Sequence, residues 1–124
     1  LEEASFLTKI PYEQEKQIFA KMDEMCPGIL VMTKGELGVT VSDGKFMYSA
    51  VPPVNRKVAD TTGAGDAFGS GFLAEFIRSG DIEKCIQFGM GNSVGNLSLV
   101  GAKTGLLKKG ETFEVVPVKK ENIL

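Results

Sequence analysis

The sequence predicts an α/β fold, because short apolar segments alternate with amphipathic helical segments along the chain. The 124 residues are 43% hydrophobic and carry a formal net charge of −2 at pH 7, which suits one compact unit with a buried core. No internal repeat, low-complexity stretch or linker interrupts this pattern. We therefore expect residues 1–124 to form a single unit.

The first half of the chain predicts two helices followed by three strands. Pro11 suits the first turn of a helix, and Pro27 with Gly28 ends that helix. A short apolar run then indicates a buried strand, and Ser42-Asp43-Gly44 is typical of a hairpin turn. The expected elements are helices at 2–8 and 11–26 and strands at 29–32, 39–41 and 45–50.

The second half predicts a pair of helices. The glycine-rich turn 63–65 opens the first helix, Gly80 ends it, and Asp81 is a good N-cap for the next. An irregular segment follows, and residues 113–118 are expected to form a last strand. The first helix of this pair has an expected apolar face of Phe68, Phe72, Leu73, Phe76 and Ile77, and a narrow face of Ala67, Gly71 and Ala74.

The composition argues against several classes of function. The small net charge favours neither nucleic acid nor an anionic membrane surface as a partner, and no apolar run is long enough to span a membrane. The chain contains no histidine, which excludes catalytic triads and metal sites built on that residue. We expect Cys26 and Cys85 to be buried free thiols, which suits a cytoplasmic location.

The strongest chemical signal is Gly63-Ala64-Gly65-Asp66 at the start of a helix. Glycine permits backbone conformations in which successive N–H groups converge, and a helix N-terminus adds partial positive charge. Together these features can bind a phosphate whose negative charge grows during transfer. The carboxylate of Asp66 could accept the proton of an attacking hydroxyl. A simple helix cap after a chain reversal would use the same residue types.

The flanking residues are more specific than a turn requires. The run Asp60-Thr61-Thr62-Gly63-Ala64-Gly65-Asp66-Ala67-Phe68 resembles the signature of the ribokinase-like (PfkB) family of carbohydrate and nucleoside kinases. The resemblance implies a three-layer α/β/α doubly wound fold, of which this chain is the carboxy-terminal portion without the lid. It makes Asp66 the catalytic base and the amides of Gly63, Ala64 and Gly65 an anion hole. ATP and Mg²⁺ are the implied cofactors.

The segment Thr33-Lys34-Gly35-Glu36-Leu37-Gly38 resembles the nucleotide loop of this family. Thr33, Gly35 and Gly38 match best, because small residues there let the backbone approach the ribose and phosphates. Lys34 could reach the phosphates or could be solvated. An ordinary β-turn is the alternative for the whole segment.

Two further matches concern metal ions. Leu1-Glu2-Glu3-Ala4 resembles the residues after the asparagine of the family's Asn-x-x-Glu motif, which makes Glu3 a candidate partner of Mg²⁺; a helix-start acid is the alternative. Some members also bind K⁺ through backbone carbonyls beside the anion hole. Asp60 and Thr62 match those positions, and Gly101 falls in the second loop of that site.

The glycine-rich helix resembles the wall of the adenine pocket. Members often carry an asparagine near its start, whereas this chain has Gly89 or Met90 there, with Asn92 close by. Asn92 is therefore a candidate nucleotide-binding residue, with helix packing as the alternative.

The resemblance implies an ATP-dependent phosphotransferase for a hydroxyl of a sugar or related small molecule. A nucleoside or vitamin-precursor kinase of the same family is one alternative, and a non-catalytic nucleotide-binding fragment is another. The first strands, the lid and most acceptor contacts are expected upstream of Leu1, so the isolated segment could be inactive. Many members pair as homodimers through the lid.

Overall fold

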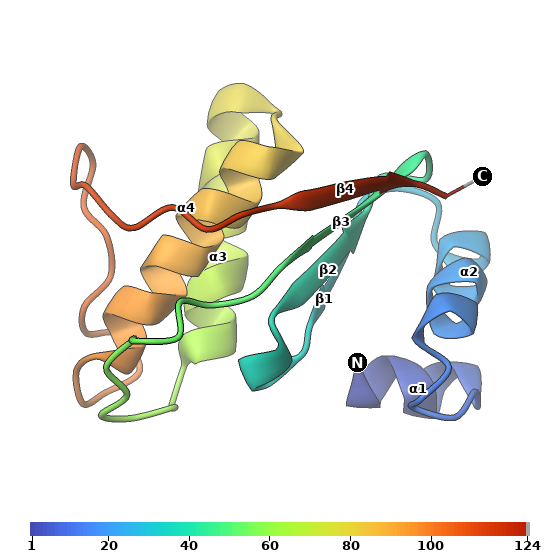
Figure 1. Ribbon diagram of the computed structural model, residues 1–124, viewed down its shortest axis with the longest axis horizontal. Coiled ribbons are helices and arrows are strands. Elements are labelled where there is room, and N and C mark those ends of the chain that lie inside the picture. The colour runs from blue at the N-terminus through green and yellow to red at the C-terminus, as the bar shows by residue number, and fades with distance from the viewer. Residues whose placement is uncertain (124) are drawn as a thin grey trace. The chain divides into compact units, whose positions relative to one another are not determined.

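The computed structural model describes residues 1–123, which form two compact units (Figure 1). Among these residues, unit 1 comprises Leu1–Ser49 and residues 119–123, and unit 2 comprises Ala50–Val118. The elements, in order, are helices α1 (Glu2–Thr8) and α2 (Glu15–Met25), strand β1 (Leu30–Thr33), a short 3₁₀ turn (Gly35–Leu37), strands β2 (Val39–Ser42) and β3 (Phe46–Ala50), helices α3 (Ala64–Ser79) and α4 (Ile82–Leu97), and strand β4 (Lys119–Asn122).

Unit 1 is built on a sheet with the strand order β1-β2-β3-β4. Strands β1 and β2 pair antiparallel, with Leu30 opposite Ser42, and β3 and β4 pair antiparallel, with Phe46 opposite Asn122. The expected hairpin is confirmed, because the Asp43 carboxylate accepts hydrogen bonds from the amides of Lys45 and Phe46.

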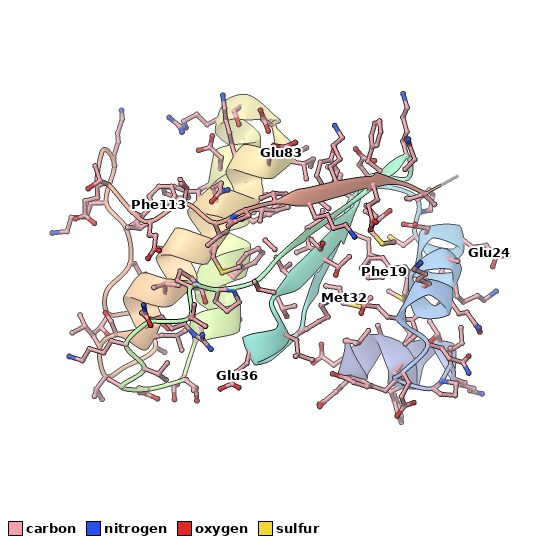
Figure 2. All side chains as sticks on the ribbon, viewed as in Figure 1. Phe19, Glu24, Met32, Glu36, Glu83 and Phe113 are labelled. Atoms are coloured by element: carbon pink, nitrogen blue, oxygen red, sulfur yellow. The ribbon has the colours of Figure 1, made fainter. Side chains whose placement is uncertain are left out.

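The core of unit 1 lies between α2 and the sheet. Ile18 and Phe19 of α2 are buried with Met32 of β1, and Figure 2 shows Phe19 and Met32 close together between these elements. The second helix begins at Glu15 and not at Pro11. Residues 11–14 form a separate turn, closed by a hydrogen bond from the amide of Gln14 to the carbonyl of Pro11.

Unit 2 is dominated by α3 and α4, which run side by side in opposite directions (Figure 1). Gly71 allows their close approach, since a Cβ there would lie 3.1 Å from both the Cβ of Asn92 and the Cα of Gly89. As expected, Gly80 ends α3 in the left-handed conformation and the side chain of Asp81 caps α4.

The apolar face predicted for α3 is only partly correct. Phe68 and Phe72 are buried, whereas Leu73, Phe76 and Ile77 are exposed. Helix α4 packs on the side of α3 that carries Gly71. A residue two positions along a helix points about 200° away, so Leu73 faces the opposite side. Of the predicted narrow face, Ala67 and Gly71 are buried and Ala74 is exposed, so that prediction is also only partly correct.

The strand expected at 113–118 is absent, and the last strand described is β4. Instead, the main chain of Val116 is bonded by the side chain of Gln87, which donates to its carbonyl and accepts from its amide. Pro117 has no N–H to offer a neighbouring strand. The segment is thus held to α4 and not in a sheet.

The two cysteines differ in exposure. Both are free thiols, as expected, but Cys26 is exposed at the end of α2 and only Cys85 of α4 is buried. Among residues 1–123, no helix is long and apolar enough to cross a bilayer.

Candidate functional site

The glycine turn lies in unit 2 and leads directly into α3. Gly63 is the N-cap residue and adopts a left-handed conformation with φ 82°. The N-cap Gly63 offers no side-chain cap to this helix, and the amide of Ala64 makes a long hydrogen bond of 3.4 Å to the carbonyl of Thr61. A Cβ on Gly65 would meet nothing within 4 Å, which leaves open space beside these amides. The geometry suits an anion.

Asp66 lies in the first turn of α3 and is exposed. Its neighbour Ala67 is buried against the rest of the unit. The backbone of the turn is therefore anchored by packing while the carboxylate remains accessible to a reacting group. Asp66 and the amides of Gly63, Ala64 and Gly65 occupy one helix start, as the sequence predicts.

Asp60 links the glycine turn to a segment far along the chain. Its carboxylate accepts hydrogen bonds from the amide of Thr62 and from the amide of Gly101, each at 3.0 Å. The hydrogen bond from the amide of Thr62 is the main reason that the pKa of Asp60 lies below its ordinary value. The amide of Gly101 and the hydroxyl of Thr62 lower the pKa of Asp60 further. The side chain of Asp60 thus connects the residues before the glycine turn to residue 101.

The carbonyl of Gly101 fits a cation site poorly. It already accepts hydrogen bonds from the side-chain amide of Asn96 at 3.0 Å and from the hydroxyl of Thr104 at 2.8 Å. A carbonyl oxygen has two lone pairs, and these two donors use both. Asp60 and Thr62 as carbonyl ligands of K⁺ remain a prediction.

Asn96 is a site neighbour that the sequence reasoning missed. Its side chain is 0% exposed, and its nitrogen donates to the carbonyls of Gly101 and Thr104. Nothing in the local pattern around an asparagine near a helix end indicates such a contact. Only the presence of a polar residue on the buried side of α4 could have suggested it.

Asn92 is also buried and has partners within unit 2. Its nitrogen donates to the carbonyl of Ala67 at 2.7 Å, and its oxygen accepts from the amide of Leu107 at 2.8 Å. These bonds join α4 to α3 and to the segment beyond α4, as the helix-packing alternative predicts. A nucleotide contact by Asn92 remains a prediction.

The loop expected to bind nucleotide lies in unit 1, between β1 and β2. Gly35 has φ 57° and Gly38 has φ 93°, so both positions need a residue that tolerates positive φ. The amide of Lys34 donates to the carbonyl of Gly38 and closes the loop. A Cβ on Gly35 would meet nothing within 4 Å, so the backbone there is open to a ligand.

The side chain of Lys34 is neither free nor solvated. Its ammonium lies 2.9 Å from a carboxylate oxygen of Glu15, which also accepts from the hydroxyl of Thr40. The side chain of Lys34 is 13% exposed. The lysine therefore joins the loop to the start of α2.

Glu3 and the loop share one hollow of unit 1. A pocket of about 390 Å³ is lined by Leu1, Glu2, Glu3, Tyr12, Thr33, Lys34 and Gly35. The structure thus brings Glu3 together with Thr33 and Gly35, although they are some thirty residues apart in the chain. The glycine turn belongs to the other unit.

Within residues 1–123, no three Cys, Asp or Glu side chains gather as they would around a metal ion. A Mg²⁺ ion that keeps several waters and is carried by nucleotide phosphates needs only one or two carboxylates from the protein. Two exposed carboxylates, those of Glu2 and Glu3, line the pocket beside the open glycine loop, and the expected partner Glu3 fits such an ion.

Comparisons with known proteins agree with this geometry. The family model described as pfkB family carbohydrate kinase matches residues 1–121. The chain is 43% identical over 63 residues to a cytidine kinase of Thermococcus kodakarensis, covering 50% of this chain and 23% of that protein. It is 30% identical over 124 residues to the ribokinase of Bacillus subtilis, covering 94% of this chain and 41% of that protein.

Solved structures show the same fold. A probable sugar kinase from Rhizobium etli CFN 42 superposes with a TM-score of 0.72 at 28% identity, covering 82% of this chain and 30% of that one. The expected ribokinase-like α/β architecture is thereby confirmed for the part of the fold present. The chain spans less than half the length of the curated relatives described above.

Proposed function

The chain belongs to the pfkB family of carbohydrate kinases, and from that premise we propose that it supplies the phosphoryl-transfer part of an ATP-dependent kinase site. The observation that carries the proposal is the uncapped start of α3. There the left-handed Gly63, the open space beside Gly65 and the exposed Asp66 occupy one turn.

In the proposed reaction, the amides of Gly63, Ala64 and Gly65 stabilise the negative charge that grows on the transferred phosphoryl group. Asp66 accepts the proton of the attacking hydroxyl. These groups come from one rigid helix start, so little reorganisation is needed when charge develops. Bound Mg²⁺ would neutralise phosphate charge, with Glu3 as its candidate carboxylate partner.

The nucleotide-binding part of the proposal rests on the loop 33–38. Its two positive-φ glycines and its open backbone at Gly35 suit close approach by the ribose and phosphates. Lys34 contributes by fixing the loop through Glu15, because its ammonium is already paired. Asn92, Thr33 and Gly38 complete the proposed nucleotide-binding set.

The proposed acceptor is a hydroxyl of a sugar or of a nucleoside. The ribokinase of Bacillus subtilis matches most of the chain, whereas the cytidine kinase of Thermococcus kodakarensis is the more identical over its shorter match. Ribose and cytidine, after which these two relatives are named, share a ribose unit that carries hydroxyl groups. A sugar is the first candidate. A nucleoside is the second candidate, because the chain is more identical to the cytidine kinase than to the ribokinase.

The test uses the full-length polypeptide that contains these residues. Wild type and Asp66→Asn are compared by ADP release with a panel of pentoses, hexoses and nucleosides. We expect Asp66→Asn to lower kcat by about 10²- to 10⁴-fold, because the hydroxyl then loses its base. Thermal stability and ATP affinity should stay close to those of wild type.

The matched control is Asp81→Asn, at the start of α4. Asp81 caps its helix through the amide of Lys84, and asparagine caps about equally well. This variant should keep wild-type turnover. Near-normal turnover in Asp66→Asn would sink the assignment of the base, and ATP binding without ADP release for any acceptor would favour a non-catalytic module.

A further inference from the structure

We propose that Asn96 is a positioning residue for the glycine turn, acting through the segment 101–104, which we call the buttress loop. The inference rests on the proposed function, because it concerns the same turn. Asn96 lies on α4, and its side chain donates hydrogen bonds to residues 101 and 104 and not to the residues proposed to contact the reacting groups. We assign its influence to the loop that it holds. A second connection lies next to it, because the carbonyl of Leu97 accepts hydrogen bonds from the amides of Ala59 and Asp60.

Asn96 holds the buttress loop at two points. Its nitrogen donates to the carbonyl of Gly101 at 3.0 Å and to that of Thr104 at 2.9 Å. Its oxygen is buried and has no hydrogen-bond partner among residues 1–123. A flipped amide would set that oxygen against two carbonyl oxygens, so the two bonds fix the orientation. An unpaired buried acceptor is destabilising, so the two donated bonds are made at the expense of the oxygen.

The buttress loop meets the glycine turn through two contacts. The amide of Gly101 donates to the carboxylate of Asp60, which also accepts from the amide of Thr62. In addition, a Cβ on Gly63 would lie 2.7 Å from the carbonyl oxygen of Ala102, so the two backbones are already in close contact. A shift of the loop would therefore move or release the turn that carries the proposed anion hole.

Gln87, also on α4, serves as a control because its side chain likewise makes two hydrogen bonds to main chain, but to a different segment. Gln87 also makes two hydrogen bonds to main chain, donating to the carbonyl and accepting from the amide of Val116. Its target segment makes none of the contacts described for the glycine turn. Replacing the half-buried Gln87 therefore shows the effect of losing two hydrogen bonds to main chain without loss of the bonds that hold the buttress loop.

The experiment compares Asn96→Leu with Gln87→Met in the full-length polypeptide. Both replacements keep approximate size and remove both bonds. Each should lower the melting temperature by a few degrees. Only Asn96→Leu should lower kcat, by about 10- to 100-fold, because small displacements of transition-state contacts cost rates of that order. The KM for ATP should stay within about twofold, since the nucleotide loop is untouched.

A second readout does not depend on activity. The amide ¹H–¹⁵N shifts of Gly63 and Gly65 should move in Asn96→Leu and stay in place in Gln87→Met. If Asn96→Leu does not fold, Asn96→Ser is smaller, keeps a hydroxyl donor and should give smaller changes of the same kind. Equal kcat losses in the Asn96 and Gln87 variants, or unmoved glycine shifts, would overturn the proposal.

A double-mutant cycle with Asp60→Asn tests the route. If Asp60 and Asn96 act through one loop, the double variant should lower log kcat by less than the sum of the decreases in the two single variants. Full additivity would mean that they act separately and would overturn the route. If the proposed function fails instead, Asp66→Asn retains turnover, while the glycine shifts in Asn96→Leu still report on positioning.

Discussion

The ammonium of Lys34 lies 2.9 Å from a carboxylate oxygen of Glu15, nineteen residues earlier in the chain. The Lys34 side chain is 13% exposed and that of Glu15 is 33% exposed, so water screens the pair only in part. The hydroxyl of Thr40 donates to the same oxygen and completes a small polar cluster. A lysine that the sequence suggests for phosphate binding is thus a link between the loop and α2.

Replacing Lys34 with methionine should lower the free energy of unfolding by about 1 kcal/mol. The change leaves the partly buried carboxylate of Glu15 without its charged partner, which costs more than losing an exposed pair. Urea denaturation measures the effect. The control is Lys21→Met, which breaks the Lys21–Glu24 pair, whose side chains are 47% and 70% exposed. Its cost should be clearly smaller, because water screens that exposed pair, and equal costs for the two variants would contradict the structural role.

Gly63→Ala and Gly65→Ala should separate folding from binding. Alanine at position 63 is strained by its positive φ and would meet the carbonyl of Ala102, so we expect a loss of about 2 kcal/mol or more. Alanine at position 65 meets no protein atom within 4 Å and improves helix propensity. It should leave stability equal or higher while its methyl group occupies the proposed phosphoryl site and lowers turnover.

Thermal denaturation and kcat are measured on both glycine variants. The expected pattern is a lowered melting temperature for Gly63→Ala and a folded, poorly active Gly65→Ala. A fully active Gly65→Ala would show that the open space beside the amides is not used by the transferred group.

The elements that were predicted well are those specified by local chemistry. Asp43 organises its own hairpin turn, Gly80 supplies a left-handed helix end, and Asp81 caps the helix that follows. Each needs only a few neighbouring residues, so the signal is complete within a short stretch of sequence. The glycine turn before Asp66 belongs to the same class.

The features that were missed depend on residues far apart in the chain. The bond between Asp60 and Gly101 spans forty-one positions, and the bonds of Gln87 replace the strand expected around Val116. The exposure of Leu73 follows from the close packing of Gly71 on α4, and no periodicity within α3 reveals which face a partner chooses. Buried asparagines such as Asn96 carry no local signature.

Acid should weaken the link between the glycine turn and the buttress loop. Hydrogen bonds from Thr62 and from the amide of Gly101 lower the pKa of Asp60 in the folded protein. A carboxyl with a depressed folded pKa stabilises the protein above its unfolded pKa and loses that contribution as pH falls through the folded value. The stabilisation by Asp60 should therefore be complete above about pH 5 and decline below about pH 4.

The measurement for Asp60 is urea unfolding of wild type and Asp60→Asn across that pH range. Asparagine can accept from one amide but presents N–H groups to the other. The variant should be less stable than wild type at neutral pH, and the difference should shrink as pH falls. A difference that stays constant down to pH 3 would show that the charge of Asp60 is not what holds the loop.

The two thiols should react at very different rates. Burial, followed by the negative charges of Glu75 and Asp81, raises the pKa of the Cys85 thiol to about 11, whereas Cys26 is exposed. The thiolate is the reactive form, so at pH 8 only about one Cys85 in a thousand is reactive, and its side chain is also inaccessible. A chromogenic aryl disulfide should therefore label one thiol quickly, and the second only after urea is added. Cys26→Ser should abolish the fast phase and Cys85→Ser should leave it intact; two fast equivalents in the native protein would contradict the burial of Cys85.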